Sequence, residues 1–348
     1  MAFESLTDRE KTILTNLINY YISTADPVGS RAIANKFDMG ISSATIRNTL
    51  QDLEEIGLVQ QPHTSAGRIP TDLGYRVYVD YLLKPEMLSD IEKQQIKQTL
   101  LREGRGVNEI LGQTCKVLSA ITTQLGVSIA PKFKSGILKR LNLIPVTSER
   151  VMVVIVLKSG LARSMIIEVE VHFKEKELAE VETILNERLS GLSLGEINES
   201  ITERLANVSG NGKLVKLFIE SKDKIWSEPK SEDIYISGAE NLVRQPEFKD
   251  LLRVSDLMKL LENGSELSEF ISNVENEGLI ITIGAENKFQ DVIDCSLVTS
   301  KYKVGKVTGT IGIIGPTRMA YSKLVSVVEY TARTISDLLS DEAKKDSE

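Results

Sequence analysis

The sequence is poor in the residues that build metal centres and disulfide frameworks. Its 348 residues include two cysteines, Cys115 and Cys295, and two histidines, His63 and His172. Two cysteines provide no disulfide framework, and both are expected to be small buried hydrophobic residues. No pair of cysteine and histidine residues has the spacing of zinc ligands. The sequence therefore predicts no metal site.

Long apolar segments are missing too. No stretch is long enough to cross a bilayer, and the first residues, MAFESLTDRE, lack the basic start and apolar stretch of a signal peptide. These absences predict a cytoplasmic protein that binds no membrane.

A chain of 348 residues is too long for one ordinary core, so two or three domains are expected.

Residue groupings typical of enzymes are also absent. The glycine-rich segment 309–315 lacks the GxGxxG spacing and is followed by proline, so its backbone is unsuited to a dinucleotide turn. His172 is the only histidine after residue 63, which makes a Ser-His-Asp grouping implausible. The sequence therefore predicts neither catalysis nor a cofactor.

The chain has an excess of acidic residues, with a net charge of −7. Nucleic-acid-binding proteins are often basic, so this charge argues mildly against DNA binding. Contact with phosphate depends on the local field, however, and a small basic surface can lie on an acidic molecule. A DNA-binding surface must therefore be recognised from the direction in which individual side chains point.

The N-terminal region begins with a long predicted helix. Thr7 and Glu10 have the spacing of a capping box, and apolar residues follow at helical intervals from Ile13 to Ile22. The helix should end before Pro27, because the residue before a proline disfavours helical dihedral angles. This helix would support the elements that follow it.

Two shorter helices are predicted next. Ser30 can cap the first and Ser42 the second, Gly40 provides a turn between them, and Gly57 ends the second. Two short helices joined by a glycine-containing turn are typical of a helix-turn-helix, whose second helix enters the major groove. Patterning alone leaves open that this shape serves protein–protein contact instead.

Helical phase selects the residues that would read DNA. If Ile46 faces the core, steps of about 100° per residue direct Ala44, Asn48 and Gln51 outward and place Thr45 and Arg47 on the flanks. Asn and Gln suit adenine edges, Arg suits guanine or phosphate, and Ala can contact a thymine methyl. The predicted DNA-binding residues of the two helices are Arg31, Ser43, Ala44, Thr45, Arg47, Asn48 and Gln51.

A strand–loop–strand pattern follows, which indicates a wing. Strands are expected at 58–61 and 69–70, with a loop between them that contains a flexible glycine. Side chains of this kind suit phosphates or a minor groove. The predicted contacts from the loop are His63, Thr64, Ser65 and Arg68.

Several segments resemble the HrcA family of bacterial heat-inducible transcription repressors. They are DPVGSR (26–31), SATIRN (43–48), LEEIGL (53–58), QPHTSAGRIPT (61–71), GYR (74–76) and GIIGPTRMAY (312–321). The resemblance covers nearly the whole chain, and the wing motif is highly specific. Ala320 departs from it, because an acidic residue is expected there in the family.

The resemblance implies a repressor of chaperone operons of the groE and dnaK type. Such a protein would bind double-stranded DNA at an inverted repeat, named CIRCE, as a homodimer, and would be released on heat stress. Its activity would be maintained by the GroEL chaperonin. The implied fold is a winged helix, a GAF-like domain, and a dimerising domain inserted into the latter. A metabolite-sensing DNA-binding regulator, with its ligand in the GAF-like domain, remains the alternative.

The rest of the chain predicts an α+β fold in which a sheet is interrupted and then resumed. Hairpin-like strands are expected at 137–146, 151–157 and 162–171, helices from 174 to 226, and further strands from 279 to 314. The expected divisions are a winged helix at 1–83, a linker at 84–106, a GAF-like antiparallel-sheet domain at 107–171 and 241–340, a mainly helical inserted dimerising domain at 172–240, and a disordered tail at 341–348.

Overall fold

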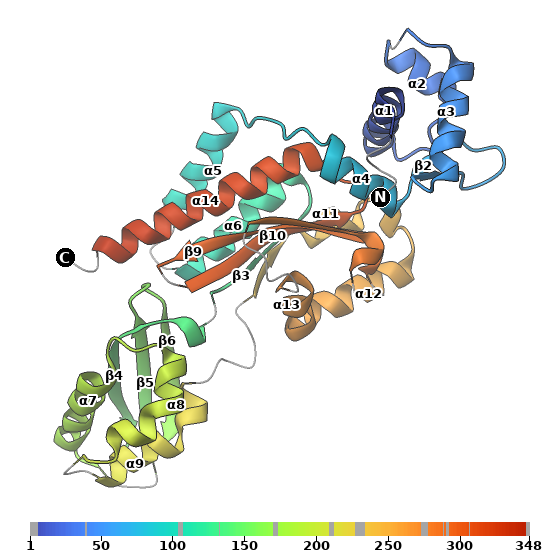
Figure 1. Cartoon of the computed structure of the whole chain (residues 1–348). Helices are drawn as coiled ribbons and strands as arrows, with labels where there is room; N and C mark the ends of the chain where they lie inside the picture. The colour runs from blue at the N-terminus through green and yellow to red at the C-terminus, as the bar shows by residue number, and fades with distance from the viewer. Residues whose placement is uncertain are drawn as a thin grey trace.

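The computed structural model has an α+β fold with three parts (Figure 1). The described residues are 6–38, 40–103, 107–131, 133–169, 173–208, 212–226, 234–272, 278–287, 289, 292–305 and 307–345. Gly106, His172 and Val171, which entered the sequence predictions, lie outside them. Among the described residues, no helix is both long and apolar enough to span a membrane.

The N-terminal part is a winged-helix domain (residues 6–82). Its elements are α1 (Asp8–Thr24), α2 (Ser30–Lys36), α3 (Ser43–Glu55), β1 (Val59–Gln60), β2 (Ile69–Pro70), α4 (Asp72–Val77) and a π-helical turn (Tyr78–Leu82). The predicted capping box forms, since the Thr7 hydroxyl accepts a hydrogen bond from the Glu10 amide at 3.3 Å. Ile13, Leu17 and Ile46 are fully buried between the helices. The helix-turn-helix and wing predicted from the sequence are therefore present.

The second part, here called the sheet domain, contains a five-stranded antiparallel sheet. Its strands run in the order β7 (Ile234–Ser237), β3 (Leu125–Ile129), β10 (Val307–Pro316), β9 (Cys295–Val304) and β8 (Leu279–Ile283). One face is covered by α6 (Val107–Thr122) and α14 (Tyr321–Lys345), with α5 (Asp90–Glu103) beside them. The other face is covered by α11 (Ala239–Val243), α12 (Leu251–Glu262) and α13 (Gly264–Ser272).

The third part, here called the inserted block (residues 136–226), is built between β3 and β7. The strands β4 (Leu138–Thr147), β5 (Arg150–Leu157) and β6 (Ala162–Glu168) form a separate antiparallel sheet in that order. The helices α7 (Glu175–Leu189), α8 (Leu194–Leu205), α9 (Gly212–Glu220) and α10 (Lys222–Ile225) accompany it. Val153, Ile155, Val181 and Leu185 are fully buried in its core.

The boundaries of the insertion differ from those expected. The strands at 137–171 were expected in the first part of the GAF-like domain, but they pair with each other and pack on α7. Conversely, β7 was expected inside the insertion, and it pairs with β3 in the five-stranded sheet. Both differences have one cause: the sequence of a segment can indicate a strand but does not identify its partner strand.

Two other expectations are corrected at the ends of the sheet domain. Residues 84–106 are not merely a linker, because α5 buries Ile96 and Leu100 against the sheet domain. The predicted disordered tail is helical at 341–345, where α14 continues, while residues 346–348 lie outside the described residues. The low hydrophobicity of both segments hid a separate packed helix, α5, in the first and the continuation of α14 in the second.

Candidate nucleic-acid interface

Helix α3 directs a small polar face away from the core. The Ser42 hydroxyl caps it by accepting a hydrogen bond from the Thr45 amide at 3.1 Å. On one side, Ile46 and Leu53 are fully buried. The exposed residues of the helix are the predicted Ala44, Arg47, Asn48 and Gln51, and the acidic Asp52 and Glu55 toward its C-terminal end. The predicted helical phase is therefore confirmed, while contact of these side chains with bases stays a prediction.

Three predicted contact residues on α3 have geometry that limits their freedom. Thr45 is half-buried, and its hydroxyl lies 2.9 Å from that of Ser42, so it takes part in the helix cap. Ser43 is half-buried beside it. Gln51 is exposed and donates to the Glu55 carboxylate at 3.4 Å, within the same helix. Asn48 and Arg47 are thus the best placed of the set for base contact.

Helix α2 supplies the flank of this face. Arg31 is exposed at its beginning. At its other end, the Lys36 ammonium lies 4.5 Å from the centre of the Tyr20 ring and 3.4 Å from the Ser23 hydroxyl. Lys36 was not predicted from the sequence, and its contacts with α1 hold it near the base of the helix-turn-helix.

The wing loop is shaped by a side chain that the sequence prediction missed. The Gln61 amide nitrogen donates to the carbonyl oxygens of Thr64 at 3.0 Å and Ala66 at 2.9 Å. The Ala66 amide donates to the His63 carbonyl at 2.8 Å, which closes the turn. The exposed residues at the tip are His63, Thr64 and Ser65. They are presented to solvent as predicted, because the glutamine satisfies the backbone beneath them.

Arg68 lies at the base of the wing and not at its tip. Its Nε donates to the Glu54 carboxylate at 2.9 Å, and Nη2 lies 2.8 Å from the same oxygen. Its backbone amide and carbonyl pair with those of Val28 at 2.9 and 2.8 Å. Arg68 therefore joins the wing to α3 and to the start of α2. The sequence prediction assigned it to phosphate and did not identify Glu54 as its partner, since the two residues are on different elements.

The glycines of the wing motif mark close approaches between backbones. A Cβ atom on Gly67 would lie 2.4 Å from the Val28 carbonyl carbon, and one on Gly74 would lie 2.0 Å from the Leu58 carbonyl oxygen. The Thr71 hydroxyl, which follows the second wing strand, donates to the Gly57 carbonyl after α3 at 2.7 Å. Much of the motif that made the sequence distinctive therefore holds the wing against the helices.

The sheet domain offers little support for the metabolite-binding alternative. Between the sheet and helices α11 to α13, the space is filled by an apolar cluster whose described members include Val127, Leu242, Leu257, Phe270 and Leu297. A small polar metabolite would have to displace packed hydrophobic side chains there.

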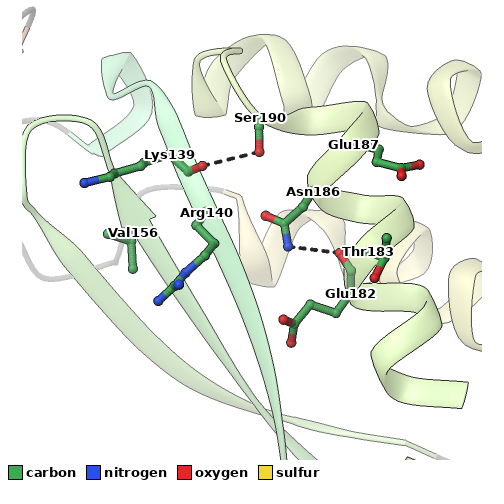
Figure 2. Close-up of a pocket in the computed structure, with 8 residues that line it drawn as sticks. All are labelled: Lys139, Arg140, Val156, Glu182, Thr183, Asn186, Glu187 and Ser190. Atoms are coloured by element: carbon green, nitrogen blue, oxygen red, sulfur yellow. Dashed lines mark hydrogen bonds between the residues drawn. The ribbon is translucent and has the colours of Figure 1, made fainter. Parts of the chain in front are cut away.

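A groove of about 740 Å³ lies elsewhere, between β4 and α7 of the inserted block. Figure 2 shows Asn186 and Glu182 projecting from α7 toward the strand. The Asn186 amide bonds to the backbone of Leu141 through both its oxygen (2.8 Å) and its nitrogen (2.7 Å), and the Glu182 carboxylate accepts from the Leu143 amide at 2.7 Å. These polar groups cover an edge strand, which explains their position without a ligand.

Two family models match most of the chain. A family model described as the winged helix-turn-helix transcription repressor, HrcA DNA-binding, matches residues 5–80, and one described as the HrcA protein C terminal domain matches residues 108–325. A crystal structure of a hypothetical protein at 2.2 Å resolution shares the fold, with a TM-score of 0.64 and 23% identity over 97% of this chain and 100% of that one.

Curated relatives are similar over nearly the full length. The heat-inducible transcription repressor HrcA of Chlorobium luteolum is 39% identical, with 98% of this chain and 99% of the relative covered. The HrcA repressor of Desulfitobacterium hafniense is 36% identical, with 96% and 98% covered. The family is one of DNA-binding repressors and not of enzymes. The chain therefore belongs to the HrcA family of heat-inducible transcription repressors.

Proposed function

We propose that this repressor binds an inverted repeat of the CIRCE type upstream of groE- and dnaK-type chaperone operons, as a homodimer in the cytoplasm. The observation that carries the proposal is the exposed face of α3, with Asn48 and Arg47 at its centre and the wing tip beside it. This face is small and the molecule is acidic overall, with a net charge of −7. Reading two half-sites at once would supply the affinity that one such surface lacks.

The inserted block provides a surface suited to a second copy of the chain. Ile144, Met152 and Ile166 are register partners across β4, β5 and β6, on the sheet face opposite the buried core. Ile144 and Ile166 are each 46% exposed. A row of apolar side chains on an open sheet face is typical of an interface, and an inverted repeat requires a two-fold partner. We therefore assign the dimer contact to this face.

Footprinting on a chaperone-operon promoter tests the operator assignment. The expected result is two protected half-sites related by a dyad, with protection lost when one half-site is scrambled. Equal protection of scrambled DNA would contradict it. For the dimer, Ile166→Lys should yield a monomer by sedimentation, whereas Leu252→Lys, on α12 and 73% exposed, should leave the assembly unchanged. A dimeric Ile166→Lys protein would remove the sheet face from the interface.

Regulation by heat would follow from a marginally stable native dimer whose refolding depends on chaperonin. Under heat stress, chaperonin would be occupied by other unfolded chains and active repressor would fall. The test is to heat the repressor, cool it with or without purified GroEL-type chaperonin, and measure operator binding. Recovery should require the chaperonin. A repressor that stays soluble and operator-bound through heating without chaperonin would contradict this regulation.

A further inference from the structure

The segment 315–321, which carries the motif GPTRMAY, lies where the sheet domain meets the winged-helix domain. It follows the last strand of the sheet and leads into α14. DNA contact does not account for this motif, because it belongs to the other domain. Three contacts join the two domains here, and side chains of this segment make two of them.

The first contact is made by the Arg318 guanidinium. Its Nε donates to the Glu247 carboxylate at 2.7 Å, and Nη2 contacts Glu247 at 3.3 Å and Gln245 at 3.2 Å. Nη1 donates to the main-chain carbonyl of Ile22 at 2.7 Å. The Arg318 and Glu247 side chains are 11% and 19% exposed. One planar group therefore bonds to the segment 245–247 of the sheet domain and to the winged-helix domain at once.

The Ile22 carbonyl is an acceptor that α1 leaves available. It lies in the last turn of that helix, where carbonyls lack intrahelical donors, and Asp26, four residues on, turns its amide to the Thr24 hydroxyl instead. That last turn contains no basic residue of its own. Arg318 supplies both the missing donor and the positive charge that favours a helix C-terminus. Helix α1 is thus completed by a residue of another domain.

The second contact is aromatic. Tyr75 on α4 and Tyr321 at the start of α14 are both buried, with ring centroids 5.9 Å apart and an interplanar angle of 57°. The third contact is polar: Arg76 on α4 donates to the Glu286 carboxylate at 2.7 Å and to the Ile281 carbonyl at 2.7 Å. Contacts at the end of α1 and along α4 hold the domain at separate points, so they restrict both tilt and rotation.

We propose that Arg318 is a positioning residue that fixes the angle of the winged-helix domain relative to the sheet domain. Helix α3 packs on α1, so the direction of α1 sets the direction of the recognition helix. In a dimer, a fixed angle presents the two recognition helices at one separation and makes binding selective for the spacing between half-sites. This last step rests on the proposed dimeric function, whereas the fixed angle does not.

Distance measurements test the fixed angle without DNA. Spin labels at Asn35→Cys on α2 and Glu269→Cys on α13, both exposed sites, would report on the two domains, with labelled chains diluted in unlabelled protein. Cys115 and Cys295 are buried and should label poorly. The parent should give a narrow distance distribution and Arg318→Gln a broad one. Arg333→Gln is the matched control, because Arg333 pairs with Glu329 on the surface of α14.

Operator binding tests the consequence. The parent should discriminate by roughly 10–100-fold against an inverted repeat whose spacer is lengthened by about half a helical turn. Arg318→Gln should bind the original repeat more weakly and lose most of this discrimination, while its affinity for scrambled DNA is unchanged. Arg318→Lys keeps the charge but not the planar fork, so its losses of affinity for the original repeat and of spacer discrimination should be smaller. It replaces Arg318→Gln in the test if that variant does not fold.

The outcomes separate the two proposals. A folded Arg318→Gln or Arg318→Lys protein with the parent's distance distribution and spacer profile would overturn the positioning role. If the distance distribution broadens in the Arg318 variants but the parent binds no inverted repeat, the positioning role of Arg318 is supported and the proposed operator is overturned instead. Broadening in Arg333→Gln as well would show that the change is not specific to the joint, and would also overturn it.

Discussion

Two nitrogens of the Arg68 guanidinium lie 2.9 and 2.8 Å from the same carboxylate oxygen of Glu54. This ion pair joins the base of the wing to the C-terminal half of the recognition helix. Both side chains are less than one-third exposed, at 21% and 32%, so solvent screens the pair only in part. In the DNA-free state, the arginine of the wing motif is therefore already paired with a carboxylate of the same chain.

Arg68→Ala should act on stability more than on phosphate contact. We expect a loss of about 1 kcal/mol in the free energy of unfolding, and a similar loss for Glu54→Ala, with strong coupling in the double variant. Urea unfolding measures these values. The slope of log affinity against log salt should stay that of the parent. A slope reduced by about one per protomer would show instead that Arg68 leaves Glu54 for a phosphate on binding.

Gly67→Ala should disrupt the contact between the wing and the segment that precedes α2. The new methyl group would overlap the backbone at Val28 and Gly29, so we expect a cost of roughly 1–3 kcal/mol or more, together with weaker DNA binding. Gly29→Ala is the matched control, since nothing lies within 4 Å of its Cβ position and its φ is −85°. That change should stay within about 0.5 kcal/mol of the parent. Equal effects of the two changes, measured by thermal unfolding, would contradict the steric explanation.

Asn48→Ala should remove base discrimination without removing DNA binding. Asn48 is exposed in the middle of the outward face of α3, and a bidentate contact to adenine is worth about 1–3 kcal/mol against the wrong base. Competition with operators that carry single base-pair changes should show the loss at one position in each half-site. Asn35→Ala, also exposed but on α2, should alter no base preference. If Asn48→Ala kept the parent's full preference, Asn48 would not be a reading residue.

Tyr75 and Tyr321, which meet between the winged-helix and sheet domains, should differ in how loss of the hydroxyl group changes stability. Burial raises the pKa of both phenols, so both are neutral at physiological pH. The Tyr75 hydroxyl is buried and has no hydrogen-bond partner in the described part of the chain, whereas the Tyr321 hydroxyl lies 2.9 Å from that of Ser296 and donates to the Thr317 carbonyl at 2.8 Å.

Tyr75→Phe should therefore be neutral or stabilising, and Tyr321→Phe should cost about 1 kcal/mol, because only the second change leaves a buried acceptor unpaired. Thermal unfolding of both variants at one pH measures the difference. Both keep the ring contact, so each serves as the other's packing control. A Tyr75→Phe protein as destabilised as Tyr321→Phe would reveal a partner for the Tyr75 hydroxyl.

Local features of the fold were predictable from the sequence because they depend on neighbouring residues. The capping box of Thr7 and Glu10, the cap at Ser42 and the phase set by Ile46 are all contained within a few turns of helix. Each proved correct in the structure. The exposed face of α3 followed from them, and with it the most direct candidates for DNA contact.

Features that depend on distant partners were not predictable in this way. Arg68 is basic and close to a flexible loop, which suggested phosphate; its partner Glu54 becomes visible only once the wing folds back on α3. Likewise, the composition of β4, β5 and β6 and the turns between them indicate strands but not the sheet that they join. The interdomain contact of Arg318 joins residues 296 positions apart. Pattern within a segment carries no information about such pairs.

The placement of the inserted block between neighbouring strands makes it separable. Ile129 at the end of β3 and Ile234 at the start of β7 are register partners, so the chain leaves the five-stranded sheet and re-enters it at the same place. A tight turn between these two residues would convert the strands into an ordinary hairpin and leave the sheet complete. The fold thus allows the inserted block to have been acquired, or to be exchanged, as a single unit without redesign of the domain that carries it.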